Sequence, residues 1–219
     1  MTGTIHQIKN GFVNLYLIDE PNQLTLVDTG MPGSGPKAVL QAIRKLGRAP
    51  QDLKRILITH ADVDHTGGAL AVRTATGAQL CASAIEAPAI MIGGLSREPR
   101  AGPVAKAIFT VVGRIFKIQP VPVDQILEPG TEIPVLGGLI VIATPGHTPG
   151  HLSFYAPATG DLIAGDSMVA FGGTLRWRET AVQWNYEQGR ASVAAQSSLG
   201  ARTVYCGHGP VLITPTFPV

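Results

Sequence analysis

The sequence predicts a layered α/β domain, because strand-like runs alternate with helical segments in both halves of the chain. Short apolar or alternating stretches bounded by glycine and proline indicate the strands, and apolar residues spaced three and four apart indicate the helices. A third observation is that histidines and aspartates stand directly after several predicted strands. The sequence therefore indicates a sheet edge that carries a polar site.

The first half of the chain contains five predicted strands and three predicted helices. Apolar residues recur at helical spacing in 36–46 and 66–76. Ser83 and Glu86 form a capping-box pattern at the start of a short helix. Strands are expected at 4–8, 12–18, 23–27, 55–59 and 78–82.

The second half repeats this alternation after a loop rich in glycine and proline at 93–103. Residues 104–118 carry a broad apolar helical face, for which core packing is the simplest role, although a lid or subunit contact within 93–121 is left open. Further strands are expected at 121–123, 139–143, 152–155, 162–164 and 202–206, and a further helix at 186–199. No linker-like composition divides the chain, so we expect a single domain over 1–219.

The composition is typical of a well-buried globular protein, with 45% hydrophobic residues, 15% charged residues and a net charge of +2. No dense basic run is present, so we expect a small-molecule substrate and no nucleic-acid partner. The N-terminus lacks the pattern of a secretory signal, and charges interrupt the most apolar stretch, so we expect no membrane span. Cys81 and Cys206 are expected to be buried and reduced, which favours a cytoplasmic location. A homo-oligomer is left open.

Potential metal ligands follow four of the predicted strands. They are His60, Asp62, Asp64 and His65 after 55–59, His147 after 139–143, Asp166 after 162–164, and His208 after 202–206. The ends of strands can present side chains from a rigid sheet into a cleft. Clustered imidazole and carboxylate groups indicate metal chemistry, because buried charges need a partner or a cation.

These residues belong to motifs whose order resembles that of the metallo-β-lactamase superfamily. The motifs are DTG at 28–30, HADVDH at 60–65, TPGHTPGH at 144–151, GDS at 165–167 and GHG at 207–209. The resemblance covers nearly the whole chain. It implies a four-layer αββα sandwich with metals at one edge between the sheets.

The resemblance also implies a site for two divalent metals, with zinc the usual metal of the family. The first metal is expected on His60, residue 62 and His147, and the second on Asp64, His65 and His208, with Asp166 bridging the two. Asp28 and His151 match residues that orient ligands from behind. A turn cap for Asp28 and a packing role for His151 are equally compatible with the sequence.

Position 62 departs from the family pattern, which is usually HxHxDH. With Asp62, three carboxylates face two divalent metals, which leaves one net positive charge in place of the two expected with histidine. We expect this change to weaken the pull of the site on electrons and to make Mn or Fe plausible beside Zn. A site in which only the second metal binds tightly is the alternative.

The function that the resemblance implies is a metal-dependent hydrolase of a small-molecule ester, lactone or thioester. A metal-bridging hydroxide, oriented by the catalytic Asp64, is expected as the nucleophile. The alternatives are a mononuclear iron dioxygenase or other redox protein on the same fold, β-lactam hydrolysis, and a non-catalytic metal-binding protein. Glyoxalase II is less favoured, because only eleven residues follow His208 and its C-terminal helical domain is expected to be missing. Trp177 and Arg178 could line a substrate groove, although packing is the simpler role.

Overall fold

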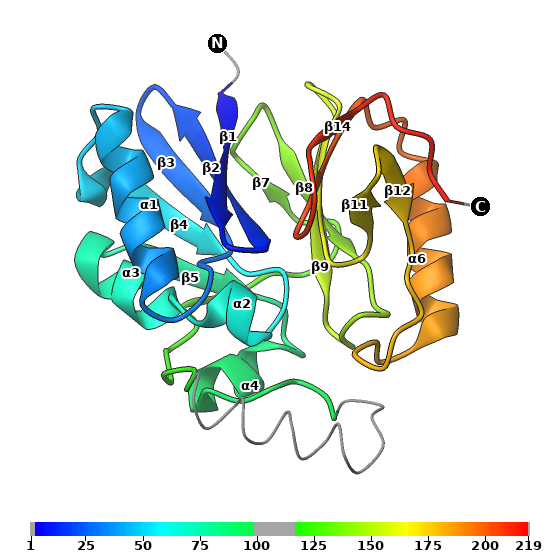
Figure 1. Ribbon diagram of the computed structural model, residues 1–219. Coiled ribbons are helices and arrows are strands. Elements are labelled where there is room, and N and C mark those ends of the chain that lie inside the picture. Colours follow the sequence, from blue (N-terminus) through cyan, green and yellow to red (C-terminus); the bar gives the residue numbers. More distant parts are fainter. Residues whose placement is uncertain (1–2, 99–116, 219) are drawn as a thin grey trace.

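The computed structural model describes residues 3–98 and 117–218, which form two facing sheets with helices on both outer sides (Figure 1). This arrangement confirms the predicted αββα sandwich. The prediction of a single domain over 1–219 stays a prediction.

The first sheet has the strand order β1-β2-β3-β4-β5-β6. Its strands are β1 (Thr4–Asn10), β2 (Val13–Glu20), β3 (Gln23–Val27), β4 (Leu53–Leu57), β5 (Gln79–Ala82) and β6 (Gln125–Ile126). The first three pair antiparallel, and β3 to β6 pair in parallel. The parallel strands therefore end at one common edge of the sheet.

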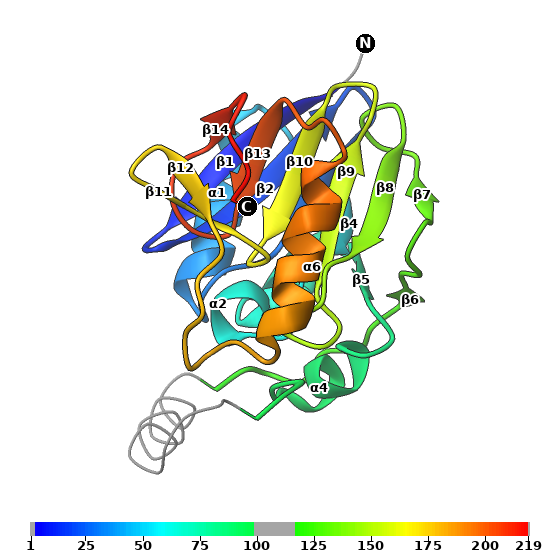
Figure 2. The same ribbon diagram turned by 90° about the vertical axis from the view of Figure 1, so that its right-hand side faces the viewer.

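The second sheet has the strand order β14-β13-β10-β9-β8-β7. Its strands are β7 (Glu132–Ile133), β8 (Leu139–Ala143), β9 (Leu152–Ala156), β10 (Asp161–Gly165), β13 (Thr203–Cys206) and β14 (Leu212–Ile213). Only β10 and β13 pair in parallel. A separate hairpin, β11 (Val169–Phe171) and β12 (Thr174–Arg176), lies beside this sheet (Figure 2).

Helices cover the outer face of each sheet. On the first sheet these are α1 (Ser34–Lys45) and α3 (Ala69–Thr76), and on the second sheet α6 (Tyr186–Ser197) (Figures 1 and 2). The shorter η1 (Pro50–Asp52), α2 (Val63–Thr66) and α4 (Ala87–Ile92) lie in the connections.

Alternation along β2 shows how the sequence builds this sandwich. Leu15 and Leu17 join the core beneath the helices α1 and α3, whereas Tyr16 and Ile18 join the core between the sheets. Successive side chains of a strand point to opposite faces, so a strand covered on both faces is apolar throughout. None of the described helices is long and apolar enough to cross a membrane.

Two of the predicted elements differ from the structure. The expected helix at 66–76 is divided into α2 and α3 at Gly67 and Gly68. A Cβ atom at Gly67 would lie 2.3 Å from Pro32, and one at Gly68 would lie 2.4 Å from the Thr29 carbonyl oxygen, so the chain passes too close to these residues for a side chain.

The expected strand at 121–123 is irregular, and pairing with β5 begins only at Gln125. Val121 packs in the core beneath the helices. Its apolar character therefore reflects core packing and not membership of a hydrogen-bonded strand. The expected apolar helical face lies almost entirely in 99–116, outside the described residues.

Candidate metal centre

The predicted ligands come together where strands of the two sheets end. His60 follows β4, and the chain then turns into α2. This helix lies below the strands, in the lower middle of Figure 1. Asp62 has extended backbone at the N-cap of α2, and Asp64 and His65 lie in the helix itself. His147, Asp166 and His208 follow β8, β10 and β13.

Two groups of possible ligands converge among the described residues. The first is His60, His147 and Asp166, the second is Asp64, His65 and His208, and in each group the ligand atoms lie within 4.8 Å of one another. Asp166 also links the groups, because its Oδ2 is 3.7 Å from His147 Nε2 and 3.1 Å from His208 Nε2. Asp62 belongs to neither group, although its Oδ2 lies 3.0 Å from His147 Nε2.

Three buried ligand atoms face this cluster without a hydrogen-bond partner among the described residues: His60 Nε2, His65 Nε2 and Asp166 Oδ1. A buried polar atom without a partner costs roughly 1–3 kcal/mol. Imidazole nitrogen and carboxylate oxygen are ordinary ligands of divalent metals. The residues therefore fit a metal site.

Asp28 and Thr59 fix the two imidazole rings of the HADVDH motif at their Nδ1 atoms, which face away from the cluster. Asp28 Oδ2 is 2.7 Å from His65 Nδ1 and accepts a 2.8 Å hydrogen bond from Thr59 Oγ1, which in turn lies 2.9 Å from His60 Nδ1. Burial lowers the pKa of His65, but the charges of Asp28 and Asp166 outweigh it and hold that pKa well above its usual value. Asp28 itself has φ of 60°, a conformation that aspartate tolerates better than most residues.

His151 lies beside the cluster and supports it through the backbone. Its Nε2 accepts a 3.0 Å hydrogen bond from the Asp166 amide, so its Nδ1 carries the proton and donates to Thr144 Oγ1 at 2.7 Å. Burial, with the neighbouring histidines, holds the pKa of His151 well below its usual value. The neutral ring therefore positions Asp166 and does not point a free nitrogen at the cluster.

His208 is held by the turn between β1 and β2. Its Nδ1 donates to the Phe12 carbonyl oxygen at 2.8 Å, and the Phe12 ring lies 5.7 Å from the imidazole. Asn14 Nδ2 donates to the carbonyl oxygens of Cys206 and Gly209, 3.0 Å and 2.7 Å away. Burial lowers the pKa of His208, but the Asp166 carboxylate outweighs it and raises the pKa to about 9.

Three side chains of the site were missed by the sequence reasoning: Gln183, Glu86 and Arg97. Gln183 Oε1 is 2.8 Å from His147 Nδ1, which fixes that ring. The fully buried Glu86 accepts hydrogen bonds from the amides of Ala61, at 2.9 Å, and Gly150, at 2.8 Å. Glu86 was interpreted as part of a capping box, and its amide does bond Ser83 Oγ at 3.2 Å, but its carboxylate joins two ligand loops instead. A polar residue just before a short helix was the only signal for it.

The predicted substrate-lining residues lie on the connection between β12 and α6. Trp177 packs on α6, since a Cβ atom at Gly189 would lie 2.0 Å from its ring. Arg178 is exposed, and its carbonyl oxygen accepts a 3.1 Å hydrogen bond from Gln183 Nε2. Contact of either side chain with a substrate stays a prediction.

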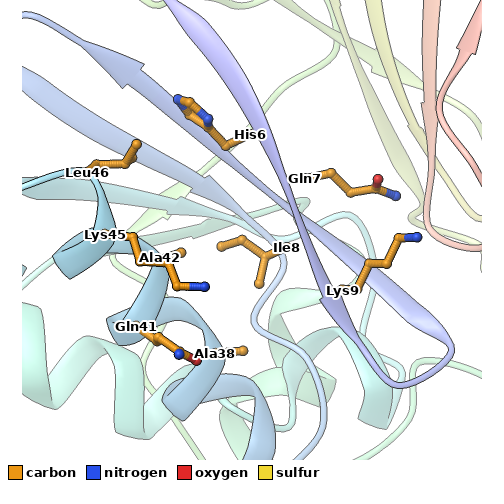
Figure 3. A pocket seen from close by; sticks show the side chains of 9 residues that line it. All are labelled: His6, Gln7, Ile8, Lys9, Ala38, Gln41, Ala42, Lys45 and Leu46. Carbon is orange, nitrogen blue, oxygen red and sulfur yellow. The ribbon is translucent and has the colours of Figure 1, made fainter.

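A separate pocket of about 320 Å³ lies between β1 and α1 (Figure 3). His6 and Ile8 of β1 face Gln41 and Lys45 of α1 across it (Figure 3). Its lining shares no residue with the ligand cluster.

Comparisons with known proteins agree with this architecture. The profile of the metallo-beta-lactamase superfamily matches residues 8–208, so the chain belongs to that superfamily. The Bacillus subtilis (strain 168) protein YobT is 34% identical over 214 residues, which cover 93% of this chain and 86% of YobT. A hydroxyacylglutathione hydrolase of Pseudomonas putida is 32% identical over 160 residues, which cover 71% of this chain and 48% of the relative. The chain thus spans about half the length of that enzyme.

A solved structure shows the same fold. It is a metallo-beta-lactamase family protein from Thermus thermophilus, with a TM-score of 0.71, 26% identity, and coverage of 97% of this chain and 75% of that one. The predicted family and fold are confirmed, and the predicted metallo-hydrolase class is confirmed at the level of the family.

Proposed function

We propose that this chain hydrolyses a small-molecule ester, lactone or thioester at a two-metal site. The observation that carries the proposal is the set of three buried ligand atoms, on His60, His65 and Asp166, that face one cluster without partners among the described residues. The thioester is the preferred substrate class, because a relative in sequence is named hydroxyacylglutathione hydrolase. The cytoplasmic location remains an expectation from the sequence.

The residues that would hold the metals are the two groups of the cluster. His60, His147 and Asp166 would bind the first metal and Asp64, His65 and His208 the second, with Asp166 close to both groups. Four imidazoles and two carboxylates are a set that favours zinc over magnesium or calcium. Manganese or iron is the alternative, to be decided by metal analysis after purification without added metal.

When bound, two divalent metals would polarise the substrate carbonyl and lower the pKa of a water molecule. Asp64 would orient that water and accept its proton, since its side chain is partly exposed and its Oδ2 lies 3.5 Å from His208 Nε2. Asp28 and Thr59 would keep the rings of His65 and His60 turned toward the bound metals.

Exposure indicates the side from which the substrate arrives. The side chain of His208 is 27% exposed, whereas that of His60 is fully buried. Phe12, 67% exposed, stacks on the His208 ring on this more exposed side. We infer that an acyl group approaches past Phe12 and His208.

The test is a substrate panel on protein stripped of metal and reloaded with zinc, manganese or iron. The panel comprises p-nitrophenyl esters, lactones, thioesters, a cephalosporin and a phosphodiester. Asp64→Asn should lower the rate on the preferred substrate by about 10²–10⁴-fold and weaken binding of the second metal. Asp19→Asn, on the remote strand β2, should change neither. Metal-loaded protein that hydrolyses no member of the panel would contradict the proposal.

A second candidate is a mononuclear iron dioxygenase. The group of His60, His147 and Asp166 is a two-histidine, one-carboxylate set, which also suits non-haem iron. Oxygen consumption by the iron-loaded protein with a thiol or persulfide substrate, without ester or thioester hydrolysis, would favour this candidate.

A further inference from the structure

A buried arginine lies inside the candidate metal centre. Arg97 follows α4, its side chain is 5% exposed, and its Nη1 and Nη2 donate to Asp62 Oδ1 and Oδ2 at 2.6 Å and 2.8 Å. Its Nε and Nη2 also donate to the Val182 carbonyl oxygen at 3.0 Å and 2.9 Å. The guanidinium therefore binds both oxygens of Asp62 and is also held by the Val182 carbonyl oxygen.

Asp62 is shared between this arginine and the first ligand group. Its Oδ2 lies 3.0 Å from His147 Nε2 and 3.5 Å from His60 Nε2, while Arg97 Nη2 lies 3.4 Å from His147 Nε2. The two short hydrogen bonds from the Arg97 guanidinium, one to each oxygen of Asp62, are those of an ionised carboxylate paired with a cation. Asp62 is thus an ionised carboxylate with one oxygen beside the ligand atoms of two histidines.

The charge of the site depends on counting this arginine. Three carboxylates and two divalent metals leave one net positive charge. Arg97, which stays protonated in proteins, restores the second. A neutral histidine at position 62 would give the same total without any arginine. Counted over the ligands and Arg97 alone, the charge equals that expected with histidine at position 62, so Asp62 by itself gives no charge reason for a harder metal than zinc.

We propose that Asp62 and Arg97 act together as one neutral ligand group at the first metal, in which Asp62 supplies an oxygen and Arg97 cancels its charge. The inference rests on the proposed function, because it requires a metal on His60 and His147. Arg97 is a positioning residue, since it acts on the metal through Asp62. In the metal-free protein, neither member of the pair is expected to tolerate loss of the other, because a buried charge without its partner is costly.

The test is a charge cycle of Asp62→Asn, Arg97→Gln and the double variant, titrated calorimetrically with zinc after removal of metal by a chelator. Asp62→Asn leaves an unbalanced cation beside the metal, so zinc affinity of the first site should fall roughly tenfold or more. Arg97→Gln removes the opposing cation, so affinity should rise several-fold. The double variant should return close to the wild-type affinity, because the two changes cancel in charge.

Two controls separate charge from geometry. Arg97→Lys keeps the positive charge but loses the planar group that binds both oxygens of Asp62, and this variant should bind zinc with an affinity within about threefold of the wild type. Arg73→Gln breaks another two-pronged arginine pair, with Asp124 at 2.7 Å and 3.2 Å, and should leave zinc affinity unchanged.

Melting temperatures of the metal-free proteins give a readout that does not depend on zinc. Asp62→Asn leaves the buried guanidinium without its carboxylate, so it should unfold at a lower temperature than the double variant. An Arg97→Gln variant that loses zinc affinity as Asp62→Asn does, while the wild type binds two zinc ions, overturns the inference. A wild type that binds no zinc overturns the proposed function, and the order of the metal-free melting temperatures then decides whether the charges are paired.

Discussion

We expect Glu86 to stabilise the ligand loops, although it belongs to none of the motifs that contain the candidate ligands. It is fully buried, and its two oxygens accept the amides of Ala61 and Gly150. Ala61 follows the ligand His60, and Gly150 lies three residues after the ligand His147. One carboxylate thus ties together the loops that carry two ligands of the first group.

Glu86→Ala removes both acceptors and leaves two buried amides without partners. Each such amide costs about 1–3 kcal/mol, so the loss should be about 2–6 kcal/mol. For a chain of this length, that corresponds to a melting temperature lower by roughly 4–24 °C. Glu86→Gln keeps one acceptor, so its effect should lie near the lower end of the range.

The assay is thermal unfolding followed by circular dichroism in the presence of a chelator, with zinc affinity measured separately. Looser ligand loops should also lower zinc affinity of the first site by about 10–100-fold. Glu128→Gln, at an exposed position, serves as the matched control and should change neither quantity. A Glu86→Ala variant with the melting temperature and zinc affinity of the wild type would refute the reasoning.

Three further predictions follow from other contacts. Gly207→Ala should abolish tight zinc binding, as measured by metal content after dialysis, because its Cβ would lie 2.0 Å from Asp166 Oδ1. Asn14→Ala removes the hydrogen bonds that hold the loop of His208, and should lower stability by about 1–3 kcal/mol in denaturant titrations. Burial raises the pKa of Asp124, but its hydrogen bonds with Arg73 and a backbone amide outweigh this effect and lower it. The stability that Asp124 contributes is therefore present above about pH 4 and lost as the pH falls through the lowered pKa. Asp124→Asn should accordingly flatten the acid side of a plot of melting temperature against pH.

Much of the fold could be predicted because local patterns and packing agree. The strand at 23–27 was predicted with its observed bounds. A short apolar run between turn residues favours a strand locally, and the layered fold buries the same run. The division between α2 and α3 was missed because two glycines within a helical pattern indicate only a weaker helix. The close approach of Pro32 and Thr29 that requires them comes from a distant part of the chain.

Most candidate ligands could be found from the sequence because they lie just beyond the ends of strands. Strand ends at one sheet edge bring such residues together. The residues that orient the ligands follow no such rule. Gln183 lies on a loop before α6 and reaches His147 across 36 positions of sequence. Nothing in its neighbours distinguishes it from an ordinary polar loop residue.

Arg97 shows why the electrostatics of a site cannot be obtained from its motif alone. The charge count made from the sequence included three carboxylates, two of which, Asp62 and Asp64, lie in the HADVDH segment and the third of which is Asp166. The cation that balances Asp62 lies 35 positions away from it in the sequence. Its surroundings, a loop rich in glycine and proline, indicate neither burial nor a partner. An aspartate in place of a ligand histidine is therefore best interpreted together with whatever cation the fold brings to it. If Asp62 and Arg97 are one unit, Asp62→His alone should weaken the first metal, because it leaves the arginine buried beside a dication, and the histidine should become favourable only when Arg97 is also replaced by glutamine.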